Sequence, residues 1–222
     1  MQDKPESGHA LLRAAELLRG LNHARPAGLI SVQRTLDGQL LALLDTAGKR
    51  VYTTRPLDQL VELLASGVGV LSELDPAQQG PSQRGVNLAD ESLHRLNWLI
   101  GARLGRDAGL APWLDPMQTY RLLRWPDFGE IGSDPEGAEL CKIIERHELG
   151  IATIVDTVQL AQHRVFGLLN SLSLCGVLTT GPAQPTGPAQ PTADPAKKPR
   201  RSKSVPHSDG WLARLRQRLR WR

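Results

Sequence analysis

A proline-rich repeat near the C-terminus limits the part of this chain that can fold. Residues 181–192 consist of the hexapeptide Gly-Pro-Ala-Gln-Pro-Thr written twice in succession. Proline donates no backbone hydrogen bond, and a stretch this poor in large apolar side chains cannot bury a core, so we expect extended, polyproline-like conformations. The repeat predicts that the folded body ends near Thr180 and that a disordered, semi-rigid basic spacer occupies residues 181–207.

The net charge of the chain changes sign near residue 195. Ten Lys and Arg side chains of residues 195–222 face a single acid, Asp209, which gives this segment a net charge of +9. The other 17 basic and 22 acidic residues leave residues 1–194 at −5, although the whole chain is at +4. A cationic tail on an acidic body predicts a polyanionic partner for the tail.

Residues 208–222 have the pattern of a short amphipathic helix. Two capping residues precede Trp211, Leu215 and Leu219, which fall on one narrow face, and arginines occupy much of the remaining arc. Helices of this composition lie at membrane interfaces. The predicted membrane- or nucleic-acid-binding residues are Trp211, Leu212, Arg214, Leu215, Arg216, Arg218, Leu219, Arg220 and Trp221.

Other interpretations of the tail stay open. Arginine can hold phosphates and tryptophan can stack on bases, so nucleic acid is an alternative to lipid. In residues 215–222, every second residue is an arginine, and the residues between them are Leu, Gln, Leu and Trp. Such strict alternation is also typical of a strand, so this segment could add to the sheet edge of a partner. A further alternative is a solvated tail, or one that binds an acidic protein surface.

Residues 1–74 have the pattern of a small α+β domain. Helical periodicity alternates with short runs rich in Leu, Ile and Val, and the turn signal Asp37-Gly38 joins two of those runs. We therefore expect a helix, an antiparallel three-stranded meander and a second helix. Their predicted ranges are 8–22 for the first helix, 28–35, 39–44 and 49–54 for the strands, and 56–65 for the second helix.

A linker at 75–89, rich in Pro, Gly and Gln, separates this domain from a mostly helical one at 90–180. Asp90 is the predicted cap of its first helix, and the sequence Ser133-Asp134-Pro135-Glu136 is a strong helix start. The predicted helices are 90–104, 116–124, 134–147, 153–160 and 162–175, with a short extended stretch at 177–180. The expected fold class is α+β.

The end of the second domain has three helical segments followed by that extended stretch. Its apolar positions are Ile154, Val158 and Leu160, then Val165, Leu168, Leu169 and Leu172, then Gly176-Val177-Leu178. This spacing, over about 134–180, resembles a winged helix-turn-helix. The resemblance implies DNA binding through the third helix, with Gln162, His163 and Arg164 as possible contacts. Because that surface is poor in basic residues, a protein-interaction role is an alternative that the fold permits.

Four of the nine aromatic residues fall within 16 positions, at Trp113, Tyr120, Trp125 and Phe128. Aromatic side chains bury large areas, so one interpretation places them in the seam between the two halves of the body. The other is a docking patch for a partner protein, because Trp and Tyr are frequent anchors at interfaces.

No motif of a catalytic, metal or cofactor site is evident. The chain lacks the glycine-rich phosphate loops and nucleophile motifs, and its histidines and cysteines are not spaced as metal ligands. Asp127 and Glu130 are a weak acid–base candidate, since carboxylates in a turn usually cap or are solvated. We expect Cys141 and Cys175 to be buried thiols in a reducing compartment.

These patterns predict a cytoplasmic protein without metal or cofactor. The N-terminus has no secretory pattern, and no apolar run is long enough to cross a bilayer. We expect a non-enzymatic adaptor or regulator, whose body binds a protein partner and whose tail tethers it to the inner face of an anionic membrane. The alternative is a DNA-binding transcriptional regulator that uses the winged-helix-like segment and the tail.

Overall fold

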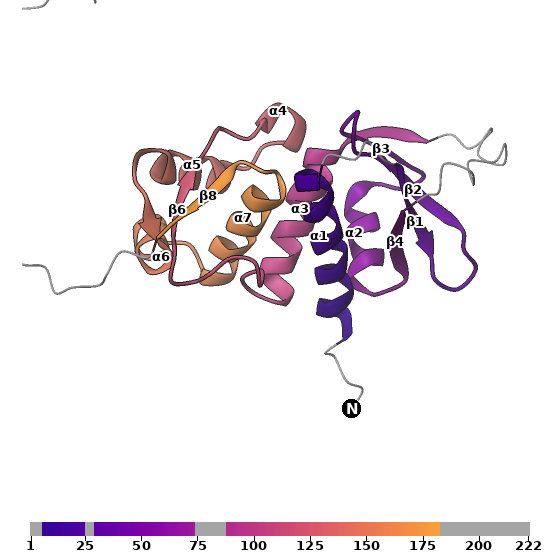
Figure 1. Ribbon diagram of the computed structural model, residues 1–222, viewed down its shortest axis with the longest axis horizontal. Coiled ribbons are helices and arrows are strands. Elements are labelled where there is room, and N and C mark those ends of the chain that lie inside the picture. The colour runs from indigo at the N-terminus through magenta and orange to yellow at the C-terminus, as the bar shows by residue number, and fades with distance from the viewer. Residues whose placement is uncertain (1–5, 25–28, 74–87, 183–222) are drawn as a thin grey trace, which may run out of the picture. The chain divides into compact units, whose positions relative to one another are not determined.

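A computed structural model describes residues 6–24, 29–73 and 88–182 of the chain. Most of the predicted spacer, the predicted tail helix and nearly all of the predicted linker lie outside these residues. The chain divides into two units, residues 1–185 and 186–222, and the first holds all the described elements. They are α1 Glu6–Ala24, β1 Leu29–Arg34, β2 Leu40–Asp45, β3 Arg50–Thr53, α2 Leu57–Ala65, β4 Gly69–Glu73, β5 Ala89–Ser92, α3 Leu93–Asp107, β6 Thr119–Leu122, α4 Phe128–Ile131, α5 Pro135–Arg146, β7 Leu149–Gly150, α6 Ile151–Val158, α7 Gln162–Leu174 and β8 Leu178–Gly181 (Figure 1).

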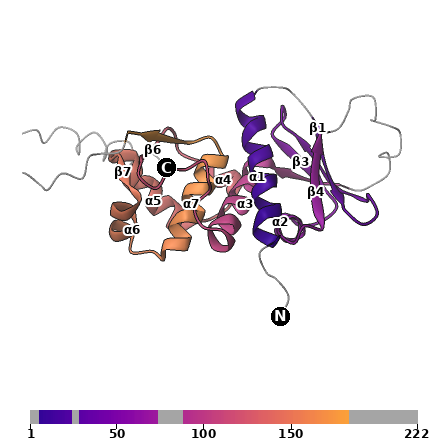
Figure 2. The ribbon, with the colours of Figure 1, turned by 60° about the horizontal axis from the view of Figure 1, so that its bottom comes forward.

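The α+β class is confirmed, because helices accompany two antiparallel sheets. The first sheet has five strands in the order β4-β1-β2-β3-β5, and it contains the predicted meander. Helices α1 and α2 lie on the same side of this sheet, as both ribbon views show (Figures 1 and 2). Apolar residues of the strands, such as Ile30, Val32 and Leu44, form the core together with Leu60 and Leu64 of α2.

Both edge strands of this sheet differ from the sequence prediction. The pattern predicts no strand at β4, which pairs with β1 along its whole length. The predicted helix start at Asp90 is wrong, because Asp90 lies opposite Tyr52 in the β3–β5 ladder. The helix begins three residues later, where the Ser92 hydroxyl accepts a hydrogen bond from the His94 amide. Strand pairing therefore outweighs the local capping signal.

The predicted helix at 116–124 is also wrong. Four of those residues form β6, which pairs with β7 on one side and β8 on the other. Tyr120 and Leu122 are buried while Arg121 between them is exposed, which is the period-two pattern of a strand. The Asp115 carboxylate accepts the Met117 amide at 2.8 Å in the turn that precedes the strand. The turn ends where β6 begins, and pairing with β7 and β8 then favours the strand over the predicted helix.

The predicted helices of the last third are present as α5, α6 and α7. Asp134 caps α5 by accepting the Gly137 amide, and Pro135 occupies its first turn, as the helix-start pattern predicts. Gly176 follows α7 with a positive φ of 65°, which is the conformation a glycine adopts most readily after a helix end. The strand β8 then completes the three-stranded sheet β7-β6-β8.

Helices α3 and α7 pack with their backbones in direct contact. A Cβ atom added at Gly101 would overlap the backbone of Ser171, and one added at Gly105 would overlap that of Gly167. The Ser171 hydroxyl donates to the Trp98 carbonyl at 2.7 Å across the same contact. The small residues on both helices therefore permit an approach that a side chain would prevent.

We predict that Gly105→Ala destabilises the protein by about 1–3 kcal/mol or more, because the new methyl group overpacks the helix contact. Gly20 of α1 is the matched control, since a Cβ there would meet nothing within 4 Å. Gly20→Ala should stabilise the protein by about 0.5–1 kcal/mol through helix propensity alone. Urea denaturation followed by circular dichroism gives both values. Equal stability of the two variants would contradict the close contact.

Candidate protein-docking site

Trp125 is a large apolar side chain that the fold holds at the surface. It is 40% exposed, and its neighbour Leu123 is 64% exposed. The Trp125 indole donates to the Glu145 carboxylate at 2.6 Å and meets the Phe128 ring edge-on, with ring centroids 6.3 Å apart. Phe128 makes a similar contact with Trp98, at 5.9 Å. The exposed indole is therefore fixed in place by a hydrogen bond and by aromatic packing.

A pocket of about 220 Å³ opens beside Trp125. Segments from both halves of the body line it: the β2–β3 turn, the start of α3, the stretch around α4, and the stretch that follows α7. Its lining residues are Lys49, His94, Arg124, Trp125, Pro126, Asp127, Glu130, Ile131, Cys175 and Val177. We call this cavity, together with the exposed Leu123, the Trp125 site.

The two acids of the Trp125 site already have hydrogen-bond partners. Asp127 accepts the Gly129 amide at 2.9 Å and so caps α4. Glu130 accepts the Ser92 hydroxyl at 2.9 Å and lies 3.1 Å from Nδ1 of His94. The carboxylates that the sequence marks as a weak acid–base pair thus hold local structure together, as capping and anchoring groups do.

The aromatic cluster that the sequence predicts is divided in the structure. Trp125 and Phe128 are together at the Trp125 site, whereas Trp113 donates to Ser173 at 3.1 Å and lies under the guanidinium of Arg19. Tyr120 is fully buried and donates to the Asp115 carbonyl at 2.6 Å. Burial, followed by the Asp115 charge, raises the Tyr120 pKa to about 12. Its assignment as a docking residue is therefore corrected to a core residue.

The predicted DNA contacts lie at the N-terminal end of α7. Gln162 and His163 are exposed there, whereas Arg164 is engaged by two acids. Its guanidinium donates to Asp134 at 2.9 Å and to Glu136 at 2.5 Å. Burial lowers the pKa of Arg164, but the hydrogen bonds and charges of Glu136 and Asp134 together raise it by more, so its pKa lies above the usual value. The guanidinium therefore stays charged and paired.

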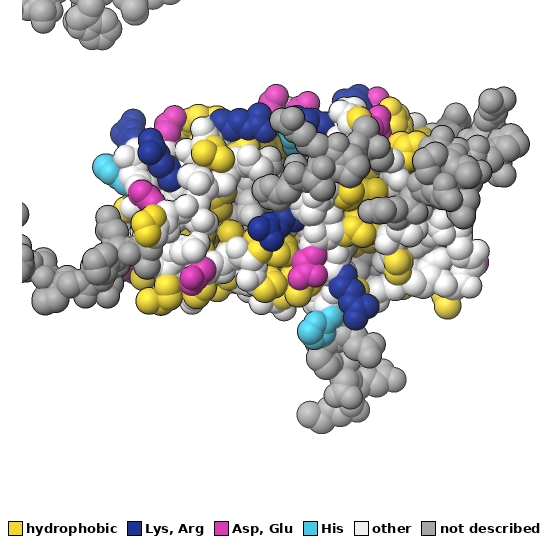
Figure 3. Space-filling model, viewed as in Figure 1, with side chains coloured by type: hydrophobic (Ala, Val, Ile, Leu, Met, Phe, Trp, Pro, Cys, Tyr) yellow, Lys and Arg dark blue, Asp and Glu magenta, His cyan; other side chains and the backbone are white. Residues whose placement is uncertain are grey.

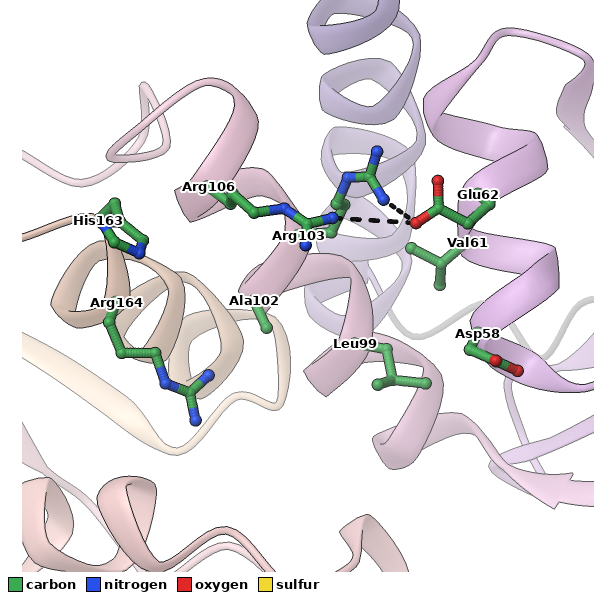
Figure 4. A pocket seen from close by; sticks show the side chains of 9 residues that line it. All are labelled: Asp58, Val61, Glu62, Leu99, Ala102, Arg103, Arg106, His163 and Arg164. Atoms are coloured by element: carbon green, nitrogen blue, oxygen red, sulfur yellow. Dashed lines mark hydrogen bonds and ion pairs between the residues drawn. The ribbon is translucent and has the colours of Figure 1, made fainter. Parts of the chain in front are cut away.

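His163 and Arg164 border a groove of about 330 Å³ between α2, α3 and α7 (Figure 4). Arg103 and Arg106 reach across it toward Glu62, as the dashed lines show. The groove is lined by Asp58, Val61, Glu62, Leu99, Ala102, Arg103, Arg106, His163 and Arg164. Each of its arginines lies within ion-pair distance of a carboxylate, so the positive charge that would attract a phosphate is partly offset.

The rest of α7 belongs to the core. Asn170 is fully buried, where its side chain accepts the Ala111 amide and donates to the Gly109 carbonyl, each at 2.9 Å. Ser171 is buried against α3. On the face drawn in Figure 3, basic and acidic side chains are interspersed. These observations weigh against α7 as a helix that enters a DNA groove.

Comparisons with protein-family models, with curated proteins and with solved structures found no match for this chain. Within the described residues, no cluster of three or more His, Cys, Asp or Glu side chains could hold a metal ion. No helix in the described part of the chain is long and apolar enough to cross a membrane.

Sequence reasoning identifies Trp125 and Phe128 but misses Trp98 and the pocket. Trp98 lies on α3, and its indole donates to Asp134 at 3.2 Å. Its partner Phe128 is 30 positions away in the chain, and no local pattern connects them. The polar pocket residues Lys49, His94 and Arg124 come from three separate segments, so only the fold brings them together.

We predict that Arg164→Gln lowers the free energy of unfolding by about 1–2 kcal/mol, because it leaves the largely buried Asp134 without its charged partner. His163→Ala, one residue away and exposed, should change stability by less than about 0.5 kcal/mol. Urea denaturation of both variants provides the test. If Arg164→Gln were as stable as His163→Ala, the structural role of Arg164 would be wrong.

We predict that both thiols resist modification in the native protein. Burial is the main reason that the pKa values of Cys141 and Cys175 rise to about 12. The reactive thiolate is therefore a minute fraction of either side chain at pH 8. Ellman's reagent should react with two thiols in urea but with neither in buffer on the same timescale. Rapid reaction of a native thiol would contradict the burial.

Proposed function

We propose that this chain is a non-enzymatic adaptor or regulatory protein, whose body binds a protein partner at the Trp125 site. The observation that carries the proposal is the exposed Trp125, fixed by Glu145 and Phe128 beside the exposed Leu123. A rigid aromatic side chain next to a pocket is typical of an interface anchor, because little side-chain entropy is lost when a partner covers it.

The second half of the proposal concerns the basic tail, residues 195–222. It would attach the protein to an anionic membrane surface, at the cytoplasmic face. Its support comes from the sequence: a net charge of +9 and an apolar stripe of Trp211, Leu215 and Leu219. Each basic residue near an anionic surface contributes about 1 kcal/mol, and the apolar stripe adds insertion.

A DNA-binding regulator is the alternative function. The order of α5, β7, α6, α7 and β8, a helix, a strand, two helices and a strand, favours the winged-helix resemblance. In the described residues, however, α7 is covered by α3 along its Gly167 face, and its Arg164 is paired with acids. Phosphate contacts in this alternative would therefore come from the tail, and binding would weaken steeply with salt.

We expect the full chain to co-sediment with vesicles of phosphatidylcholine and phosphatidylserine but not with phosphatidylcholine alone. The double variant Trp211→Asp/Leu215→Asp should lose this binding, because it places two charges on the apolar stripe. Ala213→Asp/Gln217→Asp is the matched control: it adds the same charge on the opposite face of the predicted helix. The control should retain most of the binding.

Three other results would change the interpretation. Equal losses in both double variants would show attraction by charge without insertion. Absence of the wild-type chain from anionic vesicles would overturn the membrane tether. Binding of a DNA duplex that both double variants weaken alike, with a steep dependence on salt, would instead favour the nucleic-acid alternative.

A further inference from the structure

The hydrogen-bonding capacity of the Trp125 site is unbalanced. Its acids, Asp127 and Glu130, accept hydrogen bonds from backbone amides, Ser92 and His94. Within the described residues, neither Lys49 nor Arg124 forms an ion pair or a side-chain hydrogen bond with any group. A lysine ammonium has three donors and an arginine guanidinium has five. The unused groups at this pocket are therefore donors, and a ligand that fits them carries acceptors.

The two cations come from different segments that line the pocket. Lys49 lies in the β2–β3 turn with a positive φ of 55°, and its carbonyl accepts the Leu93 amide at 3.0 Å. Arg124 follows β6 and lines the pocket together with Cys175. Burial raises the pKa of the Cys175 thiol, and the positive charge of Arg124 acts in the opposite direction. Backbone hydrogen bonds hold both segments in place, because the Lys49 carbonyl accepts the Leu93 amide and the Val177 carbonyl accepts the Leu123 amide.

Four apolar residues line the same pocket as the two cations: Trp125, Pro126, Ile131 and Val177. Ile131 and Val177 belong to the buried core, and Leu123, two residues before Trp125, is exposed. A ligand that fits this lining places an apolar side chain against these groups and a carboxylate near the pocket rim.

We infer that the Trp125 site binds a segment of a partner protein that carries Asp or Glu next to a large apolar residue. The carboxylate accepts hydrogen bonds from Lys49 and Arg124, and the apolar side chain packs against Trp125. This inference rests on the proposed adaptor function and specifies the chemistry of its partner. The chain's own tail has the wrong sign for this pocket, because Asp209 is its single acid among ten basic residues.

A library of random 12-residue peptides displayed on phage tests the inference with the full chain. Peptides are selected on the wild-type protein after depletion on a synthetic peptide of residues 195–222, which removes those that merely bind the basic tail. The selected peptides are then measured on the charge-reversal variant Lys49→Glu/Arg124→Glu, which retains that tail. The control variant is Arg121→Glu/Lys142→Glu, which changes the net charge equally at two exposed residues outside the pocket.

We expect the selected peptides to contain Asp or Glu beside Leu, Phe or Trp. Their affinity, measured by fluorescence polarisation, should fall by about tenfold or more in Lys49→Glu/Arg124→Glu and stay within about twofold in the control. Replacing the acid of a selected peptide by its amide should cause a similar loss. Trp125→Ala should weaken the same peptides.

Two results would overturn the inference, and they have different consequences for the proposed function. The first result is a set of selected peptides that contain no acid but bind the Trp125→Ala variant more weakly than the wild-type protein. It would show that the Trp125 site docks a partner of another specificity, and the adaptor function would stand. If the library gave no peptide whose affinity depends on Lys49, Arg124 or Trp125, both the inference and the docking surface would be rejected.

Discussion

The backbone contact between α3 and α7 is the constraint on which the rest of the body depends. Helix α3 continues from an edge strand of the five-stranded sheet, and α7 leads into the three-stranded sheet, so this contact joins the two halves. Helices usually pack with axes 8–10 Å apart, separated by side chains. Gly101, Gly105 and Gly167 remove those side chains. The close contact of the two backbones makes the packing dense, but a larger side chain at any of these glycines would overlap the facing helix.

That contact also determines what lies around Asp134. Its carboxylate, only 11% exposed, accepts hydrogen bonds from the Gly137 amide, the Trp98 indole and the Arg164 guanidinium. One acid thereby connects the starts of α5 and α7 with the middle of α3. Trp98 is held in one orientation, Phe128 packs edge-on against it, and Trp125 packs against Phe128. The exposed indole of Trp125 is thus the last member of a series of contacts that begins in the core.

Local signals in the sequence are sufficient for some elements and insufficient for others. The start of α5 is predictable because Asp134 and Pro135 act on their own helix. The strand β6 is not, since Tyr120 and its neighbours are also compatible with a helix, and only pairing with β7 and β8 decides. The same limit applies to the site. Trp125 is visible as an aromatic residue in a turn, but the cations and Trp98 meet it only through long-range packing.

The charges of the pocket and of the tail favour two different partners rather than one. The tail is basic, whereas the pocket is lined by Lys49 and Arg124, which have no carboxylate partner within the described residues. An acidic partner segment and an anionic lipid could both bind the basic tail by charge alone. An apolar contact at the pocket would direct the acidic segment to the pocket instead. In the proposed function, Trp125 and Leu123 would provide that contact, and with it the selectivity that charge alone lacks.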